Sequence, residues 1–231
     1  MRFFFSDMRF DIITIFSEAI ASYLNSSILG RARKKKLIKI CFHNPRDYTK
    51  NKYKKVDDKP FGGGPGMVIK TEPIIKIISK IKSKISNLLK SKIILLSPVG
   101  KQFTQKMARD WAKKYKNIIL ISGRYEGVDA RVEKIIKSYK LKIENLSIGP
   151  YILTGGELPA AIIIDALSRH IPGVLQKKES LEEVRGVGFP VYTKPEVFEH
   201  RGKKYKVPKI LLSGNHKKIQ EWKQKHSKKF F

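Results

Sequence analysis

The sequence predicts a parallel α/β sheet in which buried strands alternate with helices. Two runs, at residues 93–96 and 118–121, are continuously apolar, as in strands that are buried on both faces. A loop rich in small residues and then a segment with helical apolar spacing follow each run. The chain has 231 residues, of which 41% are hydrophobic, so it can bury the core of one large domain or of a medium domain with a small second one.

The first expected element is a strand at residues 9–16, which are β-branched and aromatic without a breaker. Ser17 is placed to cap a helix that ends near Leu24. A short second strand is expected at residues 37–42. Residues 31–39 carry six basic side chains and no acid, which suits either a solvated face or a surface that contacts phosphates.

Residues 45–67 form a long polar stretch with little apolar periodicity, and connections of this length are usually functional or disordered. Helices and strands then alternate. We expect a helix at 71–89, a strand at 93–96, a helix at 104–115, a strand at 118–121, a helix that ends at 136, a strand at 141–148 and a helix at 157–169. In the last 31 residues, the only clear helix begins near Asn215.

Three loops rich in Gly, Pro, Ser and Tyr follow the predicted strands, at residues 97–100, 122–127 and 147–156. The carboxyl ends of parallel strands meet at one edge of the sheet, where ligands bind. A loop such as 149–156, with three glycines, can wrap an adenine and offer backbone N–H and C=O groups to its edges. A plain strand-to-helix crossover is the alternative.

Composition limits the possible functions. The single cysteine, Cys41, excludes an intrachain disulfide framework and a cysteine-based metal site, and the five histidines lack zinc-site spacing. No apolar run approaches the ~20 residues of a membrane span, so we expect a cytoplasmic protein without a membrane partner. The net charge of +29 indicates a polyanionic partner, although a lysine-rich coding bias accounts for part of it. Residues 1–7 are expected to be a disordered lead or a mis-annotated start before Met8.

Several motifs allow a plain interpretation beside a functional one. Residues 61–67 (FGGGPGM) match neither the Walker pattern nor G-x-G-x-x-G, so they are either a flexible turn or a loop that approaches a nucleotide closely. Asp165 and Arg169 are four residues apart on a predicted helix, as in an ordinary surface ion pair. Tyr125, Tyr151 and Tyr192 suit base stacking or the edge of a core equally well.

Motifs of one family nevertheless occur together and in order. They are 61–67 (FGGGPGM), 96–98 (LSP), 122–129 (SGRYEGVD), 147–149 (SIG), 151–159 (YILTGGELP), 168–169 (SR), 171–173 (IPG), 192–195 (YTKP) and 211–216 (LLSGNH). Over roughly residues 8–227 the chain resembles the TrmD family of bacterial tRNA (guanine-N1)-methyltransferases.

This resemblance implies a SPOUT-type parallel sheet with a deep trefoil knot at residues 8–175, one of the rare knotted folds. A linker would follow at 176–190, and then a short, basic, mainly helical and truncated C-terminal domain that binds tRNA at 191–231. The resemblance also implies a homodimer with active sites at the subunit interface, and S-adenosylmethionine as methyl donor. Mg²⁺ is possible by family resemblance only, and the sequence shows no site for it.

By the same resemblance, the residues that hold the cofactor lie in the three loops. They are Ser97, Pro98, Gly100, Gly123, Tyr125, Glu126, Ile148, Gly149, Pro150, Tyr151, Ile152, Leu153, Gly155 and Gly156. Pro150 stands where the family has Asp, and it removes one backbone N–H donor.

Arg169 matches the family arginine that stabilises negative charge on the target guanine. The family's general base is an Asp in the linker, but residues 179–190 are about four residues shorter and contain none, so Glu183 is the nearest substitute and Glu182 the second. The residues assigned to RNA contact are Arg46, Gly62, Gly63, Gly64, Gly66, Tyr192, Lys203 and Lys204. The alternative function is a non-catalytic or impaired RNA-binding descendant of this enzyme.

Overall fold

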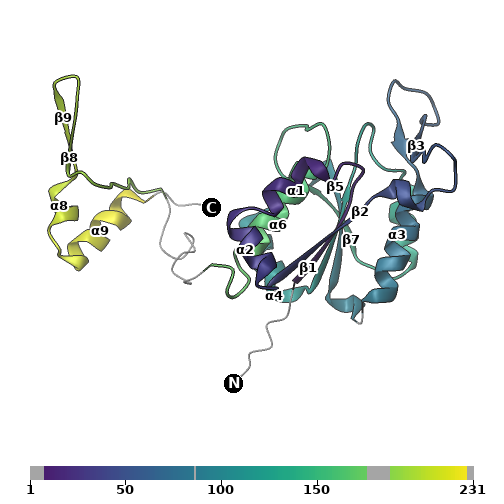
Figure 1. Ribbon diagram of the computed structural model, residues 1–231, viewed down its shortest axis with the longest axis horizontal. Helices are drawn as coiled ribbons and strands as arrows, with labels where there is room; N and C mark the ends of the chain where they lie inside the picture. The colour runs from purple at the N-terminus through teal and green to yellow at the C-terminus, as the bar shows by residue number, and fades with distance from the viewer. Residues whose placement is uncertain (1–7, 86, 176–187, 228–231) are drawn as a thin grey trace. The chain divides into compact units, whose positions relative to one another are not determined.

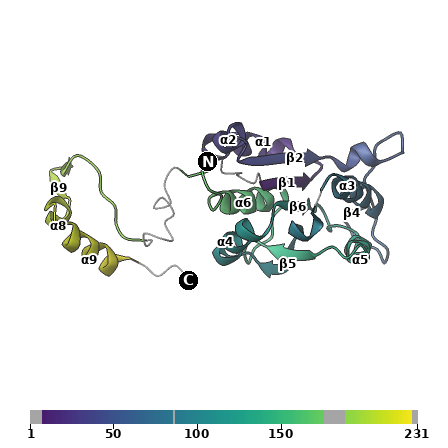
Figure 2. The same ribbon diagram turned by 90° about the horizontal axis from the view of Figure 1, so that it is seen from below.

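The computed structural model describes residues 8–85, 87–175 and 188–227, and the chain divides into two units, 1–175 and 176–231 (Figure 1). The first unit contains a five-stranded sheet with the order β2-β1-β6-β5-β7, in which all neighbouring strands are parallel. Helices cover both faces of this sheet (Figure 2). The predicted parallel α/β class is therefore confirmed, while the trefoil knot stays a prediction.

The strands of this sheet are β1 (Met8–Ile13), β2 (Ile38–His43), β5 (Ser91–Gln102), β6 (Asn117–Ser122) and β7 (Ile143–Ser147). One face packs against α1 (Glu18–Leu24), α2 (Ser27–Lys34), α4 (Gln105–Lys114) and α6 (Glu157–Ser168). The other face packs against α3 (Thr71–Lys84) and α5 (Arg131–Ser138).

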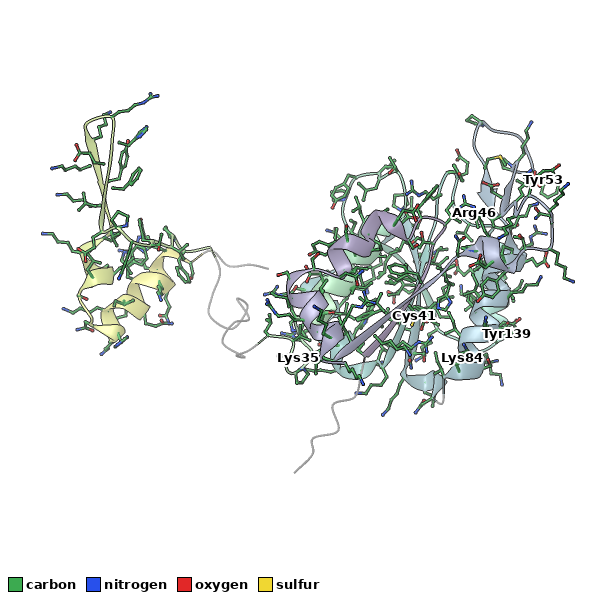
Figure 3. The ribbon with its side chains drawn as sticks, in the orientation of Figure 1. Lys35, Cys41, Arg46, Tyr53, Lys84 and Tyr139 are labelled. Carbon is green, nitrogen blue, oxygen red and sulfur yellow. The ribbon has the colours of Figure 1, made fainter. Side chains whose placement is uncertain are left out.

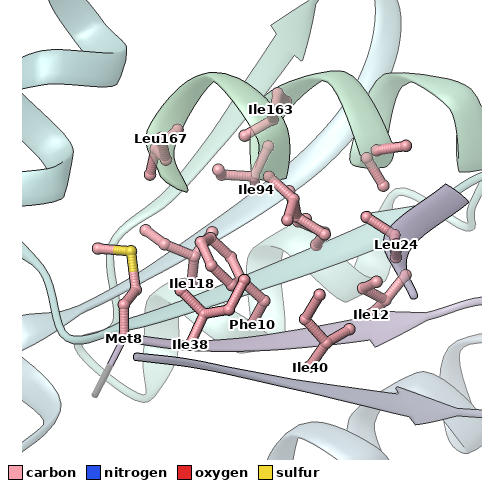
Figure 4. Close-up of a cluster of buried hydrophobic side chains, with 14 of the residues drawn as sticks. Met8, Phe10, Ile12, Leu24, Ile38, Ile40, Ile94, Ile118, Ile163 and Leu167 are labelled. Atoms are coloured by element: carbon pink, nitrogen blue, oxygen red, sulfur yellow. The ribbon is translucent and has the colours of Figure 1, made fainter. Parts of the chain in front are cut away.

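The apolar runs of the strands are continuous because each strand is covered on both faces. On β6, Ile118 belongs to the core under α6, whereas Ile119 belongs to the core under α3. Figure 4 shows the first of these cores, in which Phe10 of β1 and Ile94 of β5 face Ile163 of α6. Each such side chain stabilises the fold by about 1.5–3 kcal/mol through its burial.

Helix ends depend on particular side chains. The Thr104 hydroxyl accepts a hydrogen bond from the Met107 N–H at 3.3 Å, which starts α4 where the sequence predicts it. The predicted cap at Ser17 is wrong, because Ser17 already has helical backbone angles and its side chain makes no cap bond. The predicted helix at 71–89 ends early, since α3 stops at Lys84 and a short 3₁₀ turn, η2 (Leu88–Lys90), follows.

Strand β5 continues through the loop predicted at residues 97–100. Its pairing with β7 shifts between Leu96 and Lys101, both of which lie opposite Leu146. Residues 97–100 therefore bulge out of the sheet as an irregularity within one strand. Such bulges recur next to functional sites because they redirect side chains.

The polar stretch at residues 45–67 has more local structure than its composition suggests. It begins with a 3₁₀ turn, η1 (Pro45–Tyr48), in which the Asn44 side chain accepts a hydrogen bond from the Arg46 N–H. It then forms a small antiparallel pair of β3 (Asp57–Asp58) and β4 (Val68–Ile69).

The second unit contains an antiparallel hairpin of β8 (Val197–His200) and β9 (Lys203–Lys206), followed by α8 (Lys209–Leu212) and α9 (His216–His226). The predicted helix start is confirmed, because the Asn215 side chain caps α9 by accepting from the Lys218 N–H at 3.1 Å. The hairpin was not predicted. No described residue of this unit is buried, so the unit has little core of its own.

The expectation that residues 1–7 are a disordered lead or a mis-annotated start falls on residues that lie outside the described ranges. Within the ranges that the structure describes, no helix combines the length and the apolar character needed to cross a membrane.

The buried carboxylate of Asp11 should make the stability of the fold depend on pH. Asp11 on β1 is fully buried and accepts hydrogen bonds from His43 Nε2 and from Arg9 Nε and Nη2, each at 2.7 Å. Burial alone would raise the pKa of Asp11, but the hydrogen bonds from His43 and Arg9 outweigh it and hold the pKa below its ordinary value of 3.8. The stabilisation is thus present above that value and is lost as the pH falls through the lowered pKa.

We expect Asp11→Asn to lower the free energy of unfolding by about 3 kcal/mol at pH 7, because it breaks a buried ion pair. The difference from the unmutated protein should begin to shrink below about pH 4, where the carboxylate of the unfolded chain becomes protonated, and should shrink further as the pH falls through the lowered pKa of the folded state. Urea unfolding at both pH values measures this, with the half-exposed Asp110→Asn as control. An equal loss at every pH would contradict the assignment.

Candidate functional site

Three loops meet at one edge of the central sheet. Strands β6, β5 and β7 are neighbours, and residues 122–127, 97–100 and 147–156 lie at their carboxyl ends. The Gly156 N–H donates to the Gly123 carbonyl at 3.0 Å, and the Phe103 N–H donates to the Ser147 carbonyl at 2.7 Å. The structure therefore brings together the loops that carry the predicted cofactor residues.

Two glycines permit these loops to come close. A Cβ at Gly100 would lie 2.5 Å from the Leu146 backbone nitrogen, and a Cβ at Gly156 would lie 2.7 Å from Ser122 Cα. Backbone cannot give way as the end of a flexible side chain can. Any larger residue at Gly100 or Gly156 would push the loops apart.

The loop after β7 presents unused backbone donors beside exposed apolar side chains. The Ser147 hydroxyl donates to the Gly149 carbonyl at 2.8 Å and accepts from the Gly149 N–H at 3.2 Å, which fixes the start of the loop. Beyond it, the N–H groups of residues 151–153 donate to no other described residue. Ile152 is 84% exposed and Tyr151 53%. Such a surface offers directed hydrogen bonds and apolar cover to a flat heterocycle.

A buried ion pair that the sequence analysis missed ties two of the loops together. Glu157 is 2% exposed, and its carboxylate contacts Arg124 Nη2 at 3.0 Å and accepts from the Thr14 hydroxyl at 2.6 Å. Arg124 also donates to the Thr154 carbonyl at 3.3 Å, and its guanidinium lies 4.7 Å from the centre of the Phe16 ring. No local sequence pattern indicates this contact, because Thr14 and Glu157 are far apart along the chain.

The glycine-rich segment at residues 61–67 adjoins the same edge. The Glu126 N–H donates to the Met67 carbonyl at 3.0 Å. Gly62, Gly63 and Gly64 all have positive φ, which favours glycine. Phe61 is fully exposed and Tyr53, which Figure 3 labels, is 86% exposed. These two aromatic side chains were not among the predicted site residues.

Other predicted site residues lie around the three loops or in the second unit. Arg46, which Figure 3 labels, donates to the Ile15 carbonyl at 2.9 Å, so it also supports the fold. Asp129 was not among the predicted site residues; it lies next to the loop at 122–127, and a hydrogen bond from Arg131 lowers its pKa to about 2. Tyr192, Lys203 and Lys204 belong to the second unit.

Arg169 lies apart from the three loops within one chain. It follows Ser168 at the carboxyl end of α6, whereas the loop at 147–156 leads into the amino end of that helix at Glu157. Twelve helical residues span about 18 Å. Glu182 and Glu183 lie outside the described residues, so the structure does not place them.

An exposed apolar stripe runs along α6. Leu158 is 57% exposed and Ile162, one turn further on, is 46% exposed. Tyr23 of the neighbouring α1 is 52% exposed, and its hydroxyl donates to Asp165 at 2.6 Å, a contact that raises the pKa of Tyr23. Neighbouring exposed apolar side chains make this part of α6 a candidate contact surface.

The described residues contain no group of three or more His, Cys, Asp or Glu side chains that could hold a metal ion. Mg²⁺ therefore finds no support in this part of the chain.

Known proteins resemble the chain over nearly its whole length. A family model described as tRNA (guanine-1)-methyltransferase TrmD matches residues 8–230. A tRNA (guanine-N(1)-)-methyltransferase of Clostridioides difficile is 46% identical over 95% of this chain and 92% of its own. One of Buchnera aphidicola subsp. Acyrthosiphon pisum is 46% identical over 94% of this chain and 89% of its own. One of Dictyoglomus turgidum is 46% identical over 96% and 86%, respectively.

Proposed function

The chain belongs to the TrmD family of tRNA (guanine-N1)-methyltransferases, and we propose that it methylates N1 of the guanosine immediately 3′ of the anticodon in tRNA. The observation that carries this proposal is the family match over residues 8–230, which includes all three loops of the sheet edge. An enzyme that modifies tRNA acts where tRNA is found, so we expect it in the cytoplasm. Nothing in the comparisons favours the non-catalytic alternative.

The loop at 147–156 fits S-adenosylmethionine as the methyl donor. The backbone N–H groups of residues 151–153 suit the edge of an adenine, and the exposed side chains of Ile152 and Leu153 suit its faces. Ser97, Gly100, Gly123 and Gly156 would border the rest of the cofactor. When bound, the cofactor supplies a methyl group on a positively charged sulfur, which is a good electrophile.

The chain must make guanine N1 nucleophilic, because this nitrogen carries a weakly acidic proton at neutral pH. A carboxylate can remove that proton, and Glu183, with Glu182 as the second candidate, is proposed for this role. The guanidinium of Arg169 then stabilises the negative charge that develops on the base. The target base must leave its stack to reach these groups.

A homodimer would complete the site. Arg169 lies about 18 Å along α6 from the loops of its own chain, so we propose that it serves the loops of a second copy. The apolar stripe of Leu158, Ile162 and Tyr23 is proposed as the surface that the second copy covers.

The RNA would be held by basic and aromatic side chains around the glycine-rich segment. Residues 50–59 contain five lysines and two aspartates. The exposed Tyr53 lies within this stretch, and the exposed Phe61 follows it. Lysines contact phosphates without reading sequence, and aromatic rings stack on bases.

The test is methyl transfer from labelled S-adenosylmethionine to a tRNA with two guanosines at the 3′ boundary of the anticodon. We expect transfer to this tRNA and none when the target guanosine is replaced by adenosine. Glu183→Gln should lower the rate about 100-fold or more, because it removes the general base, while Glu182→Gln should change it little.

Two outcomes would contradict parts of this proposal. If the unmutated protein binds the cofactor but transfers no methyl group, the non-catalytic alternative holds. If only Glu182→Gln lowers the rate, the base is Glu182.

A further inference from the structure

The hairpin of the second unit has two chemically different faces. Phe198 of β8 pairs with Tyr205 of β9, and His200 pairs with Lys203. Side chains alternate along a strand, so these four residues share one face, which we call the aromatic face. The opposite face carries the two remaining pairs, which are Val197 with Lys206 and Glu199 with Lys204.

Nothing in the described part of the second unit covers the aromatic face. All eight strand residues are exposed, Phe198 at 57% and Tyr205 at 56%. The rings of Phe198 and His200 lie 12° from parallel, with their centroids 6.4 Å apart. Figure 1 shows the hairpin extending away from α8 and α9. Two large aromatic side chains are therefore held side by side on a surface without contributing to a core.

The charge around this face indicates what it binds. Residues 197–206 contain four Lys or Arg and one Glu, and Lys203 lies on the aromatic face itself. A purely apolar protein partner would have to bury these cations without compensation. An unpaired nucleic-acid strand suits both features, because its bases stack on aromatic rings while its phosphates meet the lysines.

We propose that the aromatic face of the β8–β9 hairpin stacks on unpaired bases of RNA. This inference rests on the proposed function, and it specifies how the second unit holds that substrate: by stacking as well as by charge. Phe198 and Tyr205 are the stacking residues, and Lys203 contacts a neighbouring phosphate.

The test compares full-length variants in binding to tRNA without cofactor, over a series of salt concentrations. The double variant F198L/Y205L keeps apolar side chains on the hairpin but removes the aromatic rings. We expect it to bind at least fivefold more weakly, a difference of about 1 kcal/mol. The slope of affinity against salt should stay unchanged, because no phosphate contact is lost, whereas Lys203→Ala should make it shallower by about one charge.

The matched control is Val197→Ala, which lies on the opposite face and should bind as the unmutated protein does. A direct readout is a single-stranded RNA that carries 2-aminopurine, whose fluorescence is quenched when the base stacks. The quenching should disappear in F198L/Y205L and should persist in F198W, which keeps an aromatic ring at both positions. Circular dichroism checks that each variant keeps its fold.

Two results would overturn the proposal. One is unchanged RNA affinity in F198L/Y205L. The other is a change in its oligomeric state without loss of RNA affinity, which would make the face a protein interface. Because binding is measured without cofactor, failure of the proposed methyl transfer would show only in the activity assay.

Discussion

Replacing Arg169 by alanine should lower the rate of methyl transfer about 100- to 1000-fold, the loss typical when one group that stabilises a developing negative charge is removed. Affinity for S-adenosylmethionine should change little, because Arg169 is proposed to act on the target base and not on the cofactor. Single-turnover transfer and equilibrium dialysis measure the two quantities separately.

Two variants sharpen this prediction. Arg169→Lys keeps the charge but not the planar pair of donors, so it should fall between alanine and the unmutated protein. Arg109→Ala removes a half-exposed arginine of α4 and serves as the control. Cofactor affinity that falls together with the rate in Arg169→Ala would mean that Arg169 supports the cofactor loops instead of the target base.

The sheet was predictable because strands that are buried on both faces are apolar at every position of the sequence. The runs at 93–96 and 118–121 are apolar at every position, and they proved to be parts of β5 and β6. The hairpin at 197–206 has no such apolar run, because neither of its faces packs against a core. Alternation of apolar and polar residues identifies a strand only when one face is buried.

The positions of the loops in the candidate site could be predicted from the sequence. The contacts between residues that are far apart along the chain could not. Glycines and prolines placed three loops at the carboxyl edge of the sheet, where the structure has them. The buried Arg124–Glu157–Thr14 contacts join residues from three separate segments, so no local pattern indicates them. Likewise, the motif around Arg169 identifies the residue but not the distance between it and the loops.

That distance leads to a second prediction, about the dimer. Leu158→Lys together with Ile162→Lys should yield a monomer in analytical ultracentrifugation, because two charges would lie in the apolar stripe that the second copy is proposed to cover. Methyl transfer should then fall at least 1000-fold, since the loops of a monomer have no Arg169 within reach. Leu89→Lys, at a 90% exposed position on η2, is the matched control and should change neither property. A monomer that keeps full activity would contradict the shared site.

Mixing two inactive variants separates a shared site from a dimer that is needed only for stability. Arg169→Ala lacks the cation, and Gly156→Val lacks a closed loop because its Cβ would lie 2.7 Å from Ser122 Cα. If each site takes its loops from one subunit and Arg169 from the other, a mixed dimer has one intact site. Random reassortment makes half of the dimers mixed, so about a quarter of the unmutated activity should return. If each site takes both parts from the same subunit, no dimer in the mixture contains an intact site, and activity should stay at the level of the separate variants.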